Sequence, residues 1–215
     1  MAYVRPGPGA LKGFSVRRFF WLFLPLFLVG CGITAESKWA TDEEVSRSVY
    51  VHSGPKSLSL YTVVNVRSGS GAHSGLLVNA SQRVMFDPAG TWWNPRLPER
   101  NDVHYGMSDR ALDLYVDYHT RETYYTVVQT VQVTPEVAEY AMRLVQENGA
   151  VPKAMCSNSI SSILMQLPGF ESIRRSWFPN ATMRAFAQLP GVTRVEFRDD
   201  DADDNSSVLA GQTAP

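Results

Sequence analysis

The chain has 215 residues, of which 44% are hydrophobic, and its formal net charge is −1. This length and composition suit a globular domain with a sizeable core and exclude a fibrous or wholly disordered chain. The near balance of charge also argues against the clustered basic surface that nucleic-acid binding requires, so we expect no nucleic-acid partner.

The first 31 residues combine a basic start, an apolar run and a small residue before a cysteine. Arg17 and Arg18 precede the run 19–29, and Gly30 stands directly before Cys31. This arrangement resembles a bacterial lipoprotein signal peptide over residues 1–30, which implies cleavage before a lipidated Cys31. We therefore expect a protein that acyl chains such as palmitate hold on a membrane of the bacterial cell envelope. It would face the periplasm or the exterior, on the outer membrane in a Gram-negative cell.

Two other interpretations of this segment are weaker. A transmembrane helix needs roughly 20 apolar residues, and the run 19–29 is shorter than that. A twin-arginine signal would place Ser15 one position nearer to the arginines, so general export is favoured. Cleavage would leave 185 residues and remove four basic side chains and no acid, which takes the formal charge from −1 to −5.

Residues 31–57 are mostly polar and predict a tether between the membrane and the domain, with one short helix near Asp42–Val49. The domain itself is expected over residues 58–198. Its first half is rich in β-branched and aromatic residues, which predicts strands. The expected strands are Leu58–Val66, His73–Val78, Val84–Asp87, Leu112–Tyr118 and Tyr124–Val133.

The second and third of these strands predict one hairpin, and the last two predict another. The insert 90–110 contains Trp92, Trp93 and Tyr105 and has no clear period. It predicts a loop that either covers a cleft or packs its own aromatic side chains.

The second half predicts helices. Thr134 followed by Pro135 is typical of a helix start, and the apolar spacing continues to Asn148. Further helices are expected over Cys156–Leu167 and Ala181–Gln188, with a last strand over Val192–Arg198. The predicted fold is α+β, an antiparallel sheet with the first two helices on one face. The expected core comprises Val64, Leu76, Val78, Leu114, Val116, Val128, Leu144, Ile160, Ile163 and Leu164.

Residues 199–215 begin with five aspartates among six positions. They lack the glycine and the closing glutamate of a calcium-binding loop, so an acidic disordered tail is the favoured interpretation. No metal or other cofactor is expected anywhere in the chain.

Cys156 is the only cysteine besides Cys31. In an exported protein structural cysteines normally pair, so a single thiol calls for another explanation. A thiol at a helix start meets free backbone N–H groups and the positive end of the helix dipole, which favour the thiolate and can hold an oxyanion. A small buried hydrophobic residue and an intermolecular disulfide are the alternatives.

A nucleophilic thiol needs a base, and the base needs a partner that orients it. The chain offers His52, His73, His104 and His119. His73 begins a predicted strand, and Asp87 ends the strand that follows it, so the two could meet across the hairpin. A histidine beside a turn is also common on ordinary surfaces.

The residues His73-Ser-Gly-Leu-Leu-Val and Val84-Met-Phe-Asp87 resemble the histidine hairpin of papain-like enzymes of the NlpC type. Cys156-Ser-Asn-Ser-Ile160 resembles their nucleophile helix, and Trp177-Phe-Pro-Asn180 resembles the segment after it. Because the histidine precedes the cysteine, the order matches the circularly permuted branch that includes lecithin retinol acyltransferase. The resemblance implies a papain-like fold, Cys156 as nucleophile, His73 as base and Asp87 as orienting residue, although aspartate is less typical in that third place.

The expected activity is therefore hydrolysis of an amide bond in cell-wall peptide by a Cys-His-Asp site on a membrane-anchored protein. An acyl-lipid or thioester hydrolase or acyltransferase using the same residues is the first alternative. A non-catalytic lipoprotein that keeps the shell as a binding module is the second. The oligomeric state cannot be inferred from the sequence.

Overall fold

We describe a computed structural model of the chain, which covers residues 1–2 and 35–213. The expected signal segment and Cys31 lie outside these residues. The chain divides into two units, Met1–Gly32 and the compact Ile33–Pro215, and only the second is described below. No helix in the described part of the chain has the length and apolar content needed to cross a membrane.

The compact unit is α+β, with one sheet of seven strands in the order β4-β5-β3-β2-β1-β6-β7. All neighbouring strands are antiparallel. The strands are β1 (Ser57–Asn65), β2 (Gly71–Asn79), β3 (Arg83–Phe86), β4 (Glu99–Arg100), β5 (Val103–Tyr105), β6 (Tyr124–Gln132) and β7 (Thr193–Phe197). The helices are α1 (Asp42–Arg47), α2 (Asp109–His119), α3 (Pro135–Glu147), α4 (Cys156–Leu164), α5 (Pro179–Phe186) and α6 (Ser206–Thr213).

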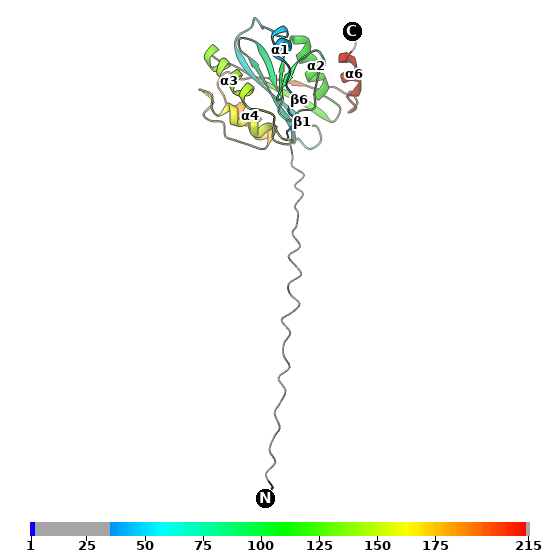
Figure 1. Cartoon of the computed structure of the whole chain (residues 1–215), viewed down its shortest axis with the longest axis vertical. Helices are drawn as coiled ribbons and strands as arrows, with labels where there is room; N and C mark the ends of the chain where they lie inside the picture. The colour runs from blue at the N-terminus through cyan, green and yellow to red at the C-terminus, as the bar shows by residue number, and fades with distance from the viewer. Residues whose placement is uncertain (3–34, 214–215) are drawn as a thin grey trace. The chain divides into compact units, whose positions relative to one another are not determined.

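Helices cover both faces of the sheet, and Figure 1 shows α3 and α4 on one side of it with α2 and α6 on the other. Strand alternation sends Leu60 and Leu76 into a core shared with α3, α4 and α5. The neighbouring residues Tyr61 and Leu77 enter a second core with Trp92 and α2. The prediction of α3 and α4 on one face is confirmed.

Most predicted strands and helices are confirmed within a few residues, including the start of α4 at Cys156. The strand expected over Leu112–Tyr118 is wrong, because these residues belong to α2. Ser108 caps this helix by accepting from the Ala111 N–H, and Ala111, Tyr115 and Tyr118 form its buried stripe. The second hairpin therefore does not exist, and β6 pairs with β1 and β7 instead.

The core prediction is also wrong in part, and for Leu114 and Val116 the reason is the same. Leu114 lies on a helix outside the buried stripe and is only half-buried. Val116, Val128 and Leu144 are also partly buried and pack against the two cores. The other six predicted core residues are buried.

The insert 90–110 is more ordered than expected, because β4 and β5 extend the sheet beyond β3. Trp92 is 2% exposed and packs edge-on against His104 and Tyr115, whereas Trp93 is 42% exposed. This insert therefore packs Trp92 into the second core and Tyr105 into the first, and leaves Trp93 in solvent.

The segment expected as a tether packs on the edge strand instead of hanging free. Asn101 N–H donates to the Lys38 carbonyl, Ala40 N–H donates to the Glu99 carbonyl, and Trp39 forms a β-bridge with Arg100. A capped helix, α1, follows as predicted. Backbone pairing therefore orders the chain from Lys38 onward.

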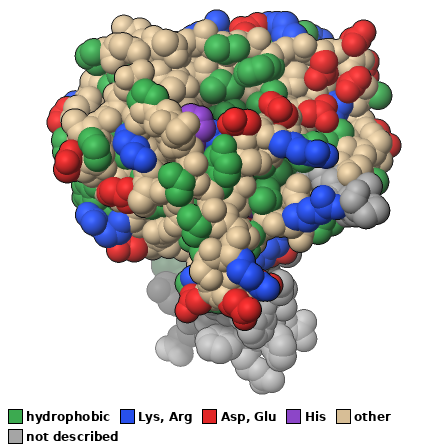
Figure 2. All heavy atoms as spheres, turned by 90° about the horizontal axis from the view of Figure 1, so that it is seen from above, with side chains coloured by type: hydrophobic (Ala, Val, Ile, Leu, Met, Phe, Trp, Pro, Cys, Tyr) green, Lys and Arg blue, Asp and Glu red, His purple; other side chains and the backbone are tan. Residues whose placement is uncertain are grey.

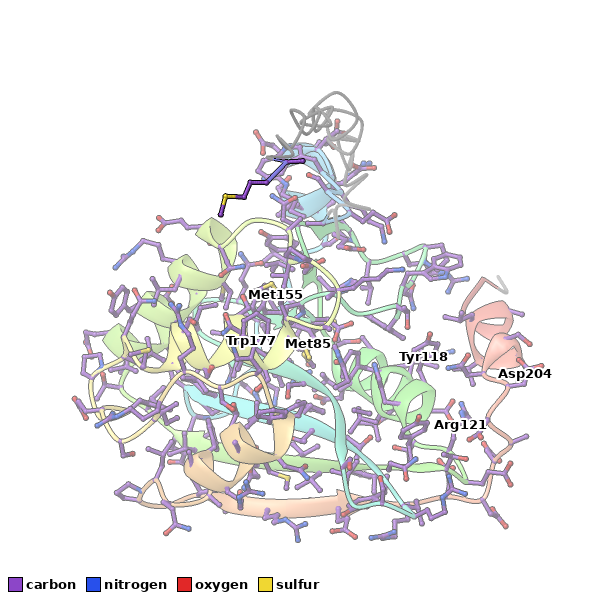
Figure 3. The ribbon with its side chains drawn as sticks, turned by 90° about the horizontal axis from the view of Figure 1, so that it is seen from below. Met85, Tyr118, Arg121, Met155, Trp177 and Asp204 are labelled. Atoms are coloured by element: carbon purple, nitrogen blue, oxygen red, sulfur yellow. The ribbon has the colours of Figure 1, made fainter. Side chains whose placement is uncertain are left out.

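The acidic C-terminal stretch also differs from the disordered tail predicted for it. Arg121 pairs with Asp201 at 3.0 Å, and Asn205 donates to the Tyr118 carbonyl at 3.3 Å. Helix α6 then lies beside α2, and Figure 3 places Arg121, Tyr118 and Asp204 on this side of the unit. The stretch finds basic and backbone partners on the α2 end that its composition did not reveal.

Candidate active site

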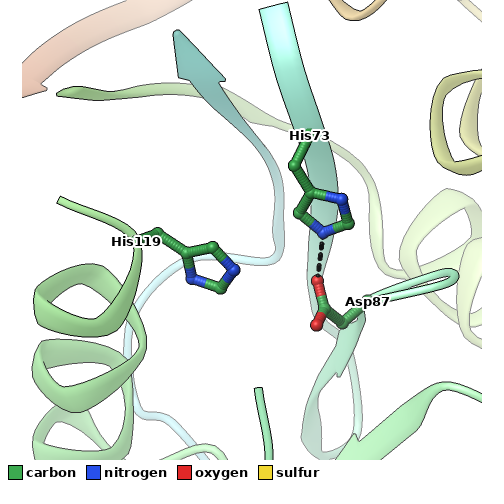
Figure 4. Close-up of side chains that lie close together, drawn as sticks. All are labelled: His73, Asp87 and His119. Atoms are coloured by element: carbon green, nitrogen blue, oxygen red, sulfur yellow. Dashed lines mark hydrogen bonds and ion pairs between the residues drawn. The ribbon is translucent and has the colours of Figure 1, made fainter. Parts of the chain in front are cut away.

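The site predicted from the sequence comes together around His73. His73 lies near the start of β2, Asp87 follows the last residue of β3, and Cys156 is the first residue of α4. The β2–β3 pairing brings the first two close, and Leu76 faces Phe86 in that register. His73 Nε2 lies 2.6 Å from Asp87 Oδ1, as Figure 4 shows. The carboxylate accepts, so the imidazole proton lies on Nε2.

Cys156 belongs to the same cluster, because its thiol and the His73 imidazole lie close enough for each to shift the pKa of the other. The backbone N–H groups of Ser74 and Ser157 also help to lower the pKa of this thiol. Cys156 is buried, with 7% of its surface exposed. All three predicted site residues thus belong to one cluster.

The helix start gives Cys156 its polar surroundings. Met155, the residue before α4, provides no side-chain cap, so the first N–H groups of the helix are not occupied by one. Ala154 holds a positive φ of 66°, which is strained for a residue with a side chain. The chain therefore makes a sharp entry into α4 and leaves N–H groups beside the sulfur, where an oxyanion could be held.

The titration behaviour follows from this cluster. Burial alone would raise the pKa of the Cys156 thiol, but the hydrogen bond and charge of His73 outweigh it and lower that pKa from its ordinary 9.0. Burial alone would lower the pKa of His73, but Asp87 and Cys156 together raise it to about 10. Burial alone would raise the pKa of Asp87, but the same ion pair holds it below its ordinary value. These directions favour a thiolate beside an imidazolium.

Two residues of α2 that the sequence analysis did not select support Asp87 and His73. The Tyr115 hydroxyl donates to Asp87 Oδ1 at 2.6 Å. The His119 ring lies parallel to that of His73 with centroids 5.6 Å apart, and its Nδ1 donates to the Tyr115 carbonyl at 2.8 Å. Burial lowers the pKa of His119 to about 4, so this ring stays neutral beside the charged one. A helical interpretation of residues 109–119 would have put Tyr115 and His119 on one face.

Two glycines make room for these contacts. A Cβ on Gly75 would lie 2.5 Å from the Tyr115 hydroxyl, and a Cβ on Gly90 would collide with Asp87 Oδ2. The glycine in the His73-x-Gly75 sequence therefore has a steric role, because it lets α2 approach the histidine strand. Gly90 plays the same part for the carboxylate.

Asp102 connects the two halves of the site. Its Oδ2 accepts from the N–H of Val151 at 2.8 Å and from that of Ala89 at 3.3 Å, and its carbonyl accepts from the Asp87 N–H at 2.8 Å. Burial raises the pKa of Asp102 to about 6. One side chain thus ties the loop after Asp87 to the segment that leads into α4.

The remaining histidines lie outside the triad. His104 is 2% exposed and packs against Trp92, and burial lowers its pKa, so it is a neutral core residue. His52 accepts from the Gly54 N–H near the start of β1. Of the four histidines, only His73 combines a carboxylate partner with a thiol.

Comparisons with protein families, curated proteins and solved structures give no match. No relative therefore supports or opposes the arrangement, and its interpretation depends on the geometry.

Proposed function

We propose that the chain is a cysteine-dependent hydrolase whose site is Cys156, His73 and Asp87, on a fold of the permuted papain-like type. The observation that carries this proposal is that one imidazole pairs with the Asp87 carboxylate at 2.6 Å and lies close enough to the Cys156 thiol to lower the pKa of that thiol. A structural thiol has no need of this arrangement, whereas nucleophilic catalysis does.

In this proposal the Cys156 thiolate attacks the carbonyl carbon of an amide or ester. Backbone N–H groups at the start of α4 hold the oxyanion that forms. The imidazolium of His73 gives its proton to the leaving amine or alcohol, and an acyl-enzyme forms on sulfur. The neutral imidazole then takes a proton from water, whose oxygen attacks the acyl carbon, and the thiolate leaves. Asp87 keeps the imidazole oriented in both steps.

The proposed substrate is the amide bond of a cell-wall peptide, in keeping with an envelope lipoprotein. An acyl lipid or thioester is the alternative for the same residues. To distinguish these two substrates, purified wall material and an acyl thioester are incubated in parallel with the full chain. Cys156→Ala is the matched control. Release of wall peptides by the native chain alone supports the proposal, and turnover by Cys156→Ala would refute the role of the thiol.

The proposed location is the cell envelope, with acyl chains on Cys31. Lys38, the first residue paired with β4, follows Cys31 by seven positions. At 3.3–3.6 Å per residue, these positions reach at most about 25 Å, so the anchor would hold the domain close to the bilayer. Metabolic labelling with an alkyne fatty acid tests this proposal, since label should enter the native chain and not Cys31→Ser.

A further inference from the structure

Two adjacent aromatic side chains stand out of the surface after α4. Trp177 is 57% exposed and Phe178 is 72% exposed. Single apolar residues on a surface are common, whereas adjacent large aromatics left in water are typical of an interaction surface. We refer to residues 174–178 as the aromatic loop.

The aromatic loop is held in place by its own hydrogen bonds. The Ser176 N–H donates to Ser161 Oγ of α4 at 2.9 Å, and the Phe178 N–H donates to Ser176 Oγ at 3.1 Å. Pro179, the next residue, is buried and lies so close to Gly71 that a Cβ there would be 2.7 Å from the proline ring. The aromatic side chains are therefore presented outward by a braced segment.

The aromatic loop borders the candidate active site. Asn180 donates to the Gly69 carbonyl at 2.6 Å, in the turn that leads to His73. Thr182 shares a 2.8 Å hydrogen bond with Ser157, the neighbour of Cys156. The segment that follows the aromatic loop therefore contacts both the turn before His73 and the start of α4.

The charge around the aromatic loop is one-sided. From Ser172 to Val195 the chain has four arginines and no acidic residue, although the whole chain has a net charge of −1. Arg174 donates to the backbone carbonyls of Glu171 and Ile173, and Arg175 has no ion pair among the described residues. The nearest acid in sequence, Glu171, accepts from the Gly169 N–H. Arg174 and Arg175 are both exposed residues, and neither forms an ion pair with a described acid, so both can pair with phosphate groups.

We propose that the aromatic loop docks on an anionic phospholipid bilayer. Trp177 and Phe178 enter the interfacial layer, where amphipathic aromatic rings are favoured, and Arg174 and Arg175 pair with lipid phosphates. The domain then sits with the thiol near the membrane surface. The proposal does not depend on hydrolase activity, because it uses none of the three site residues.

The test measures where Trp177 lies when the full chain is reconstituted in vesicles of phosphatidylethanolamine and phosphatidylglycerol. Tryptophan fluorescence is quenched by lipids brominated on their acyl chains or by aqueous acrylamide. The fluorescence of Trp177 is obtained by subtracting the fluorescence of Trp177→Phe from that of the native chain. This variant keeps an aromatic ring at the position. Phe197→Trp, on the edge strand β7, serves as the matched control at another exposed aromatic position.

We expect brominated lipid to quench the fluorescence of Trp177 at least twofold more strongly than that of the tryptophan introduced by Phe197→Trp. Quenching of Trp177 by brominated lipid should fall at least twofold in the double variant Arg174→Gln/Arg175→Gln. It should fall by the same factor for the native chain in pure phosphatidylcholine vesicles. Unchanged access of acrylamide to Trp177 on adding vesicles would overturn the proposal. So would equal bromolipid quenching in neutral vesicles, or burial of Trp177 in vesicle-free protein through self-association. Cys156 alkylation, measured in parallel, should be the same in all these variants, which separates this proposal from the hydrolase.

Discussion

At the residue scale, the site depends on side chains that fit into spaces left by glycine. Gly75 and Tyr115 form one such pair, because the hydroxyl would lie 2.5 Å from an added Cβ and itself donates to Asp87. The hydroxyl is therefore both the cause of the steric conflict and a support for the carboxylate. This coupling can be tested with a double-mutant cycle.

We predict that Gly75→Ala slows alkylation of Cys156 at least tenfold, because Tyr115 and then Asp87 must move. Tyr115→Phe alone removes one hydrogen bond to a charged group and should cost about 2 kcal/mol of stability. Combined, Gly75→Ala/Tyr115→Phe should recover part of the lost reactivity, since the hydroxyl that clashes is gone. Strictly additive effects on the alkylation rate would contradict the steric explanation.

The buried ion pair also predicts a pH dependence of stability. The pKa of Asp87 is lowered from 3.8 on folding, so its contribution is present above pH 3.8 and lost on acidification. The pKa of His73 is raised from 6.5 to about 10, so its contribution is present below pH 6.5 and lost as the pH rises toward 10. The pair should therefore stabilise most between about pH 4 and 6.5.

We expect Asp87→Asn to lower the free energy of unfolding by about 3 kcal/mol at pH 6, as breaking a buried pair does. The deficit relative to the native chain should shrink as the pH approaches 10. Urea unfolding at pH 6 and near pH 10 measures this difference in the free energy of unfolding. Asp113→Asn, on the exposed side of α2, is the control. A deficit that does not change with pH would show that the imidazole is uncharged.

At the element scale, the sequence allowed candidate site residues to be selected but did not predict α2, the helix that contacts them. His73, Asp87 and Cys156 could be selected because strand alternation, a turn and a helix start each leave a local pattern. Tyr115 and His119 were missed because 112–118 alternates well enough to suggest a strand, while the Ser108 cap and the spacing of Ala111, Tyr115 and Tyr118 decide for a helix. Long-range pairings such as β6 with β1 and β7 have no local signal.

Asp102 shows the same limit, because its role depends on two loops that are distant in sequence. We predict that Asp102→Ala loosens the segment leading into α4, which loses the hydrogen bond from the Val151 N–H. The free energy of unfolding of this variant should be about 2 kcal/mol lower than that of the native chain. Alkylation of Cys156 should be at least fivefold slower.

Hydrogen exchange at Val151 and Ala89 reports the loss directly. Asp42→Ala, on exposed α1, is the control and should leave both positions protected. Retained protection of Val151 in Asp102→Ala would contradict the bridging role.

At the scale of the whole molecule, the ordered unit is larger than the sequence indicated at both ends. Residues 38–40 pair with the edge strand, and the acidic stretch packs on α2. Composition predicted a tether and a tail because polar and acidic stretches lack apolar periodicity. Their partners, the edge of β4 and Arg121, could be found only from the fold.

Figure 2 shows basic and acidic side chains interspersed over the face in view.

We predict that truncation after Arg198 lowers the melting temperature by several degrees and increases hydrogen exchange in the last turn of α2. The reason is that Arg121 loses Asp201 and the Tyr118 carbonyl loses Asn205. A truncated chain with the melting temperature of the full one would show that the stretch behaves as a disordered tail.

The most direct test of the account is the pH profile of Cys156 alkylation by iodoacetamide in the full chain carrying Cys31→Ser. A thiolate held by His73 predicts rates that reach their plateau well below the ordinary thiol pKa of 9.0. In His73→Ala the midpoint should shift upward toward that value, with at least a tenfold slower reaction at pH 7. Profiles with the same midpoint in both proteins, at or above 9, would contradict the claim that these residues form a nucleophilic site.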